Sequence, residues 1–343
     1  MTLRKNQTIT MMRHIALSSF AVSPTNRRLL GLLAVLIIVF GFAVGKNLFS
    51  PAALWSMGIQ LPEFAILSLA MMLTLLSGGL DLSIIATADL SALTTAYVLH
   101  HVAMLGYGGI FIAFAAGLGV AALIGVVNGI LISLLGVSPI LATLGTMTAV
   151  KGIGIGLTHG GVVSGFPSLV TFIGNGTLLG VPFSLFILAL IVLPLGLMLT
   201  RSPLGTFIAI TGTDESVVRY SGVATYKVII KVYVLSAMLS AVAGFIMMGR
   251  FNSANPSYGE SYLLVTILAA VLGGVDPNGG FGRISGLLIA LVILQLISTA
   301  FNLLGLSPFL TLAIWGGTLV LTAGVGILRE RFGALHVFRR KLS

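Results

Sequence analysis

The stretch Ser77-Gly78-Gly79-Leu80-Asp81-Leu82-Ser83 separates two long apolar runs with small residues and a single carboxylate. The hydrocarbon core of a bilayer has no water to satisfy free N–H and C=O groups. A polar break between apolar runs must therefore lie at the membrane surface or line a protected cavity. We predict that one membrane helix ends here and that the next begins.

The composition of the whole chain supports this interpretation. Of its 343 residues, 57% are hydrophobic and 8% are charged, and the mean hydropathy is +1.13. A soluble domain carries roughly a quarter charged residues, so the chain is predicted to be an all-α integral membrane protein. Its apolar runs are continuous rather than alternating, which disfavours a β-barrel. Because the chain has no cysteine, disulfides and thiolate metal sites are excluded.

Apolar runs of about 20 residues can cross a bilayer as helices. The sequence predicts about ten, with approximate ranges 29–45, 63–79, 83–100, 109–135, 139–157, 183–200, 229–249, 262–274, 284–304 and 309–327. The eighth is short, which predicts a broken or tilted helix. Together they form a transmembrane domain over 29–327, between basic tails at 1–28 and 328–343.

Basic residues gather on one side of this arrangement. With the N-terminus inside, the cytoplasmic loops hold Arg201, Arg219, Lys227 and Arg283 in addition to the two basic tails. The outer loops hold only Lys46 and Arg250. Cytoplasmic loops of membrane proteins are enriched in Lys and Arg. We therefore expect a multi-pass inner-membrane protein with both termini in the cytoplasm, and the net charge of +10 reflects topology rather than nucleic-acid binding.

Pairs of glycines four residues apart predict close helix packing. Gly41 and Gly45 form one such pair, and Gly125 and Gly129 form another.

Polar side chains inside the spans are candidates for contact with a solute, because they are costly in lipid. They are Glu63, Asp89, Asn128, Thr143, Thr146, Lys151, Gln295 and Asn302. Of these, Asn128, Thr143, Thr146 and Asp89 are the candidate pathway residues. The polar or broken character of the second, fifth and eighth spans favours them as the pathway lining.

The charged groups among these candidates differ in depth. Glu63 and Asp81 are placed at span ends, which leaves Asp89 as the mid-span carboxylate. Lys151 and Asp89 could pair across spans. Asp81 itself has two interpretations that the sequence leaves open: it caps the helix that follows, as Asp often does, or it contacts a partner.

Segment 201–228 is the one long cytoplasmic loop. Pro203 can begin a short helix within it and Gly222 can end one. Its mixed polarity fits an anchor at the membrane surface or a docking element for a soluble partner, and composition does not separate the two.

The glycine-dense segment Gly273–Arg283 predicts a tight inner loop. It is not a nucleotide site, because no strand precedes it, and no G-x-x-x-x-G-K-[ST] pattern occurs in the chain. No nucleophile–base arrangement and no set of metal ligands stands out. We therefore expect a chain that is not an enzyme. Active transport would draw its energy from another chain or from an ion gradient.

Taken together, several segments resemble the permease subunits of bacterial carbohydrate ABC importers, of the ribose/xylose/galactose and autoinducer-2 type. The resemblance covers about residues 30–328. The segments that carry it are Ser77–Ser83, Asn128-Gly-Ile-Leu-Ile, Pro139–Met147, Leu204–Gly212, Tyr220-Ser-Gly222, Leu268–Gly274 and Gly279–Arg283.

This resemblance implies a fold like that of the vitamin B12 importer permease, with about ten helices. It implies a second permease subunit, identical or different, a cytoplasmic ATP-binding subunit that holds ATP and Mg²⁺, and a periplasmic sugar-binding protein. This chain would bind no cofactor of its own and would contact membrane lipid.

The resemblance also assigns roles to residues. Segment 204–222 becomes the coupling segment that docks on the ATPase, and its candidate coupling residues are Gly205, Gly212, Asp214, Ser221 and Gly222. The motif residues with an expected structural role are Gly78, Gly79, Asp81, Ser83, Gly273, Gly274 and Gly282. The expected function is ATP-driven import of a monosaccharide-like solute. The alternative is an ion-coupled secondary transporter of a small neutral solute, for which Asp89 would be the ion site.

Overall fold

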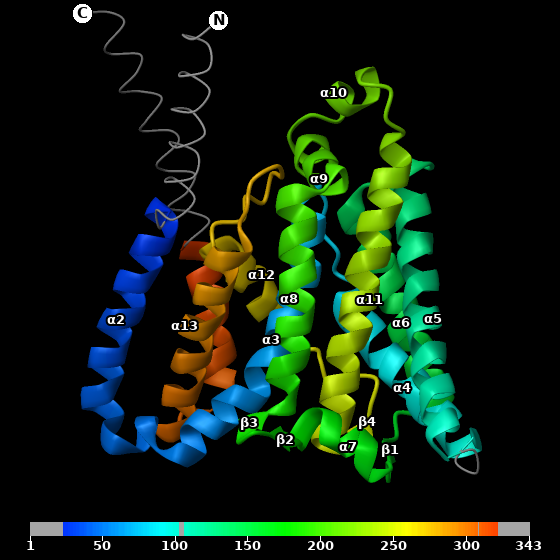
Figure 1. Ribbon diagram of the computed structural model, residues 1–343. Helices are drawn as coiled ribbons and strands as arrows, with labels where there is room; N and C mark the ends of the chain where they lie inside the picture. Colours follow the sequence, from blue (N-terminus) through cyan, green and yellow to red (C-terminus); the bar gives the residue numbers. More distant parts are fainter. Residues whose placement is uncertain (1–22, 103–105, 308, 322–343) are drawn as a thin grey trace, which may run out of the picture.

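The computed structural model describes residues 23–102, 106–307 and 309–321 (Figure 1). Its helices are α2 (Pro24–Val44), η1 (Gly45–Phe49), α3 (Pro51–Leu76), α4 (Ile84–Val102), α5 (Gly106–Ser133), α6 (Pro139–Thr158), α7 (Ser168–Asn175), α8 (Phe183–Arg201), α9 (Pro203–Thr213), α10 (Glu215–Tyr220), α11 (Thr225–Phe251), α12 (Tyr262–Leu272), α13 (Ile284–Leu303) and Phe309–Leu321. Its strands are β1 (Val163–Ser164), β2 (Thr177–Leu178), β3 (Val181–Pro182) and β4 (Ser253–Ala254).

The described part of the chain is a bundle of long apolar helices. Seven of them are long and apolar enough to cross a membrane, namely α2, α3, α5, α6, α8, α11 and α13. Two shorter apolar helices, α12 and Phe309–Leu321, lie among them. The chain is therefore a multi-pass helical membrane protein. Helix α4 has 19 residues but carries Asp89, several hydroxyl groups and two histidines, so it is less apolar than the others.

Each predicted span coincides with one described helix, although the last is described only as far as Leu321. The second differs most: it was expected at 63–79, but α3 begins at Pro51. Ser50 caps this start, because its hydroxyl accepts the Ala53 N–H at 3.2 Å, and proline fits the first helical position. Pro62 is accommodated within the helix. Glu63 therefore lies in the middle of α3 and not at a span end.

Helix α11 runs through the centre of the bundle and packs against α3, α4, α5 and α7. Its contact with α5 depends on glycine, as predicted. A methyl group on Gly125 would lie 2.6 Å from Val234 Cα, and one on Gly129 would lie 2.7 Å from Ile230 Cα. The described residues show no helix packed on Gly41 and Gly45. Gly45 ends α2 with φ +68°, and among the described residues an added methyl group on Gly41 meets only the ring of Phe49.

The two ends of the bundle are built differently (Figure 1). At one end, α9 and α10 project beyond the long helices. At the other end lie α7 and two small antiparallel sheets, β1 with β4 and β2 with β3. Helix α7 is fixed to the end of α11, because the Asn175 amide donates to the carbonyl of Arg250 at 2.9 Å. The long helix α11 thus connects the two ends.

Candidate functional site

The segment Pro203–Gly222 forms two short helices at the projecting end of the bundle. Helix α9 begins as predicted, with Pro203 in its first turn and the Ser202 hydroxyl accepting the Gly205 N–H at 3.2 Å. Helix α10 is capped by Asp214, whose carboxylate accepts the Ser216 N–H at 2.9 Å and its hydroxyl at 2.6 Å. These hydrogen bonds lower the pKa of Asp214 below its usual range. Gly222, with φ +78°, follows α10 as predicted.

The tip of this segment is open to its surroundings. Asp214, Ser221 and Gly222 are exposed. Tyr220 is 91% exposed and Val217 is 48% exposed. The described residues leave this tip, with its apolar and aromatic side chains, uncovered, and two capped helices hold it. Such a surface has the character of a protein contact.

The other two candidate coupling residues face inward. Gly205 is buried, and a methyl group there would lie 2.5 Å from the carbonyl oxygen of Met198 in α8. A methyl group on Gly212 would collide with the Leu76 carbonyl oxygen and lie 2.6 Å from Gly280 N. These two glycines therefore hold the segment against the bundle.

Gly212 belongs to a junction of three chain segments, which we call the glycine junction and define as Gly78, Gly212, Gly279 and Gly280. Gly280 N donates to the Leu76 carbonyl at 3.0 Å. A methyl group on Gly279 would lie 2.6 Å from the Gly212 oxygen and 2.8 Å from Gly78 Cα. Gly78, Gly279 and Gly280 all have positive φ, which glycine adopts at little cost. Through this junction, the end of α3, the end of α9 and the loop before α13 touch backbone to backbone.

The remaining motif glycines also have structural surroundings. A methyl group on Gly79 would collide with the Tyr233 hydroxyl, and one on Gly273 would lie 2.7 Å from Leu287 Cα. Gly274 has φ +84°. A methyl group on Gly282 would lie 3.1 Å from the Leu76 side chain. Gly279 and Gly280 were not singled out as site residues, although their place in a glycine-dense loop was a usable signal.

A cavity of about 560 Å³ opens beside this junction. Its walls come from the α3–α4 break, the α5–α6 turn and the α9–α10 segment. Among the lining residues are Gly79, Ser138, Thr213, Glu215, Arg219 and Asn278. The cavity therefore lies between the projecting helices and the bundle, and a movement of α9 and α10 would change its shape.

Below the junction, buried polar groups fasten the break to three other helices. The Asp81 carboxylate accepts the Ser83 N–H at 2.9 Å and the Ser83 hydroxyl at 2.6 Å. Its second oxygen accepts the Ser236 hydroxyl of α11 at 3.3 Å. The Asn128 amide of α5 donates to the Ser83 hydroxyl at 2.8 Å. Thr143 of α6 accepts the Leu82 N–H at 3.1 Å. We call these residues the polar brace.

The polar brace favours the capping interpretation of Asp81 over the partner-contact interpretation. The Asp81 carboxylate binds Ser83, the residue before α4, and Asp81 is 1% exposed, so it holds the start of this helix. Asn128 and Thr143 are buried with it. The Asn128 Nδ2 and the Thr143 hydroxyl bind the protein itself, whereas the Asn128 Oδ1 has no hydrogen-bond partner among the described residues. Thr146 is half-buried, and its hydroxyl donates to the Ala142 carbonyl at 2.9 Å. Asp89 is buried and accepts the Gly259 N–H at 3.3 Å.

A second buried polar group was not foreseen from the sequence. Arg250, expected in an outer loop, lies in the last turn of α11 and forms two hydrogen bonds to Glu63 at 2.7 and 3.0 Å. The Tyr262 hydroxyl donates to the same carboxylate at 3.0 Å. The Glu63 side chain is 0% exposed and that of Arg250 is 16% exposed. This pairing could have been predicted from the sequence, because Glu63 and Arg250 each lie beside long apolar segments. An acid and a base in a medium of low polarity stabilise each other.

The expected pairing of Lys151 with Asp89 was wrong. Lys151 of α6 binds Glu260, at 2.5 Å, in the loop that leads into α12. Asp89 instead binds the backbone of this loop at Gly259. The sequence placed Glu260 outside the spans, so the pairing depends on how far this loop enters the bundle.

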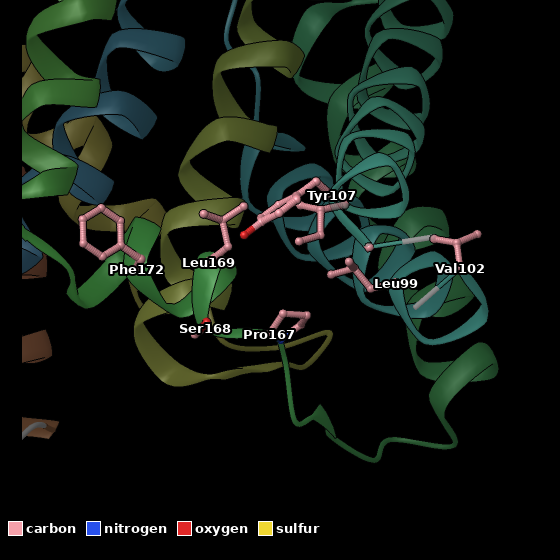
Figure 2. Close-up of a pocket in the computed structure, with 9 residues that line it drawn as sticks. Leu99, Val102, Tyr107, Pro167, Ser168, Leu169 and Phe172 are labelled. Carbon is pink, nitrogen blue, oxygen red and sulfur yellow. The ribbon is translucent and has the colours of Figure 1, made fainter. Parts of the chain in front are cut away.

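Figure 2 shows a pocket of about 500 Å³ at the end of the bundle opposite α9 and α10. It lies between the end of α4, the start of α5 and helix α7, and Leu99, Tyr107, Pro167 and Leu169 are among its lining residues. Tyr107 is 81% exposed. This end of the bundle therefore also presents an open, largely apolar surface.

Comparison with known proteins shows the family to which the chain belongs. Residues 54–323 match the family model described as the branched-chain amino acid transport system / permease component. The chain is 35% identical over 287 residues to the ribose import permease protein RbsC of Escherichia coli (strain K12), which covers 82% of this chain and 87% of that protein. No solved structure matches the chain with significance.

Two further relatives are named after solutes other than ribose. The L-arabinose transport system permease protein AraH of Escherichia coli (strain K12) is 31% identical over 269 residues, 78% of this chain and 80% of its own length. The autoinducer 2 import system permease protein LsrD of Yersinia enterocolitica (serotype O:8 / biotype 1B) is 31% identical over 262 residues, 75% of this chain and 78% of its own length.

Proposed function

This chain belongs to the family of permease components typified by branched-chain amino acid transport systems, and on that premise we propose that it is the membrane-spanning permease subunit of an ATP-driven importer. The observation that carries the proposal is the α9–α10 segment. It projects from the bundle with an exposed aromatic tip, and the glycine junction connects it rigidly to the break between α3 and α4.

The proposed solute is a monosaccharide-like polyol. The relatives are named for import of ribose, for transport of L-arabinose and for import of autoinducer 2. The first two are neutral pentoses, and the apolar spans of this chain carry few charges that would select an ion. The family description names branched-chain amino acids. Leucine is therefore the solute with which transport of a sugar should be compared. The ion-coupled alternative is less well supported, because the relatives are components of import systems and the Asp89 carboxylate binds the protein backbone.

In this proposal the chain crosses the membrane about ten times and folds like the vitamin B12 importer permease. Support comes from the described helices that match the ten predicted spans. Arg201 ends α8, Arg219 lies in α10 and Arg283 comes directly before α13. These element ends belong to the side of the bundle that carries α9 and α10 (Figure 1), which fits a cytoplasmic location for that side. Both termini would then also be cytoplasmic.

The proposed partners follow from the same arrangement. A cytoplasmic ATP-binding subunit would dock on α9 and α10 and would hold ATP and Mg²⁺, so this chain needs no catalytic site or cofactor of its own. A periplasmic solute-binding protein would dock at the opposite end, where α7 and the pocket of Figure 2 lie. A second permease subunit would complete the pathway. This second subunit is either another copy of this chain or a different chain.

Co-purification tests the docking surface. We would express the chain with the ATPase encoded beside it and compare Tyr220→Asp with Tyr107→Asp. Both tyrosines are highly exposed, at opposite ends of the bundle, so the second variant controls for the loss of a surface aromatic ring. We expect wild type and Tyr107→Asp to retain the ATPase and Tyr220→Asp to lose it. The proposal fails when no ATPase associates with the wild-type chain.

A further inference from the structure

The ion pair between Lys151 and Glu260 differs from the ion pair between Glu63 and Arg250, because the described residues leave it largely exposed. The two side chains are 38% and 53% exposed, whereas the Glu63 side chain, which pairs with Arg250, is 0% exposed. Lys151 is the only charged residue of α6. Exposed ion pairs are common at the surface of a bilayer. The interpretation of this ion pair therefore depends on how deep in the membrane it lies.

The depth of Lys151 follows from helix geometry. Lys151 lies 12 residues after Pro139, the first residue of α6, and seven before Thr158, the last. At a rise of 1.5 Å per residue, these separations are about 18 and about 10 Å. The hydrocarbon core of a bilayer is about 30 Å thick. The ion pair therefore lies within the hydrophobic layer, in the half nearer to α7.

Lipid is an unsuitable neighbour for exposed charges at this depth. Charged side chains within spans normally face a bundle interior or a water-filled cavity. Irregular backbone at membrane depth is tolerated in the same two places, and Glu260 lies in such a stretch, between β4 and α12. The described residues leave this pair exposed, so it does not face the interior of this chain's own bundle. The other suitable neighbour is water, enclosed between this chain and a second subunit.

The surroundings of the pair combine polar side chains with two exposed apolar ones on the same face of α6, Leu144 and Ile155. Ser257 and Ser261 are exposed on the loop beside Glu260, and Thr148 is exposed one turn before Lys151. No described atom lies within 4 Å of where a side chain on Gly152 would begin. Behind the loop, Asp89 accepts the Gly259 N–H and holds this backbone in place. The result is an open, partly polar wall on α6 and the loop before α12.

Resting on the importer function proposed above, we propose that Lys151 and Glu260 line a water-filled solute route and hydrogen-bond the solute as it passes. The Lys151 ammonium donates hydrogen bonds and the Glu260 carboxylate accepts them. A sugar hydroxyl does both, so a neutral polyol can bind across the pair without displacing either charge. Because the pair has no net charge, it creates little long-range attraction for a single ion, which suits passage of a neutral solute.

The chain has no cysteine, so the route can be tested by single cysteines without knowledge of the solute. We would introduce Thr148→Cys and Ser257→Cys, and Leu190→Cys as the control. Leu190 is 75% exposed on α8, seven residues after Phe183, and therefore lies about 10 Å from that end of its helix. The probe is a membrane-impermeant, positively charged methanethiosulfonate, applied to the complete importer from each side, with and without ATP and vanadate.

We expect the reagent to modify Thr148→Cys and Ser257→Cys in at least one of these states, and to leave Leu190→Cys unmodified throughout. When both wall cysteines stay as unreactive as Leu190→Cys on both sides and in every state, the pair faces lipid or a dry interface, and the inference is overturned.

Transport by the reconstituted importer, with its own binding protein, tests the contact with solute. The probes are ¹⁴C-ribose and ¹⁴C-L-arabinose. The variants are Lys151→Met and Glu260→Gln, and Lys231→Met, an exposed lysine of α11, is the control. We expect at least a tenfold fall in uptake for the first two, with the ATPase still bound, and wild-type uptake for the control. Wild-type uptake in Lys151→Met and Glu260→Gln contradicts this inference alone.

The two proposals fail in different ways. When no ATPase associates with the chain, the proposed importer function is wrong. When the ATPase associates but the wild-type protein transports neither sugar, the solute is neither of these pentoses, and the cysteine experiment still decides whether the route exists.

Discussion

Gly212 in α9 lies so close to the carbonyl oxygen of Leu76, at the end of α3, that no side-chain carbon fits between them. The same carbonyl accepts the Gly280 N–H at 3.0 Å. A displacement of α9 must therefore move the α3–α4 break or separate these backbones. This contact directly connects α9 to the break between α3 and α4.

Gly212→Ala is expected to open the glycine junction, because the new methyl group would overlap Leu76 and approach Gly280. Overpacking of this kind costs about 1–3 kcal/mol. Gly119→Ala is the matched control, since Gly119 is exposed on α5 with no described atom within 4 Å of an added methyl group. Thermal unfolding of the detergent-purified chain should show a lower midpoint for Gly212→Ala only. Equal midpoints for the two variants would contradict the role of the junction.

Asp81→Ala is expected to destabilise the polar brace, because it leaves the buried Ser83 and Ser236 hydroxyls without their acceptor. An orphaned buried polar group costs about 1–3 kcal/mol. Asp81→Asn keeps one acceptor oxygen for Ser83 and should lose less. Thr200→Ala, which removes an exposed hydroxyl bonded to its own helix, is the control. The order of midpoints expected in thermal unfolding is Thr200→Ala, then Asp81→Asn, then Asp81→Ala as the lowest.

Arg250→Met is expected to be the most destabilising of these changes, because it leaves the Glu63 carboxylate buried without a counter-charge. Breaking one side of a buried ion pair costs about 3–5 kcal/mol. The double variant Glu63→Gln, Arg250→Met removes both charges and should recover part of the loss. Arg219→Met breaks an exposed pair with Glu215, and such pairs contribute about 0.2–1 kcal/mol. A double variant no more stable than Arg250→Met would argue against a charge effect.

The cap of α10 should depend on pH. Hydrogen bonds from Ser216 lower the pKa of Asp214, so the carboxylate stabilises the helix above its ordinary unfolded pKa, which is about 3.9. That contribution is lost as the pH falls through the lowered folded value. Hydrogen–deuterium exchange over 214–222, corrected for intrinsic rates, should therefore become faster at the acid end of a pH 3–7 series. Asp214→Ser, whose hydroxyl also caps but does not titrate, should remove this pH dependence.

The sequence was most informative where a local property is sufficient. Apolar run length located the helices, because a membrane span must be long and apolar whatever its neighbours are. The starts of α9 and α10 are set by local capping contacts of Ser202, Pro203 and Asp214, which reach no more than three residues along the chain. The sequence was misleading at α3, where residues 51–62 include Pro51, Gly58 and Pro62 but continue the helix from the Ser50 cap.

The candidate site was only partly accessible to such reasoning. The break at Ser77–Ser83, Gly212 and the Gly273–Arg283 loop were each recognised, but as separate motifs. Their meeting at one junction joins residues more than 60 positions apart. Asn128 and Thr143 were recognised as polar groups inside spans, and the structure shows them bound to the break.

The amino-acid sequence by itself determined that this is a helical membrane protein, where its spans lie, which loop projects and which family it resembles, because these depend on composition, run length and short motifs. Only the tertiary structure decided the partners of the charges. It paired Glu63 with Arg250 and Lys151 with Glu260, and it placed Asp89 behind a loop. In a medium of low polarity a buried charge is stable only beside a compensating group, and which group lies beside it is settled by the packing of helices that are distant in sequence.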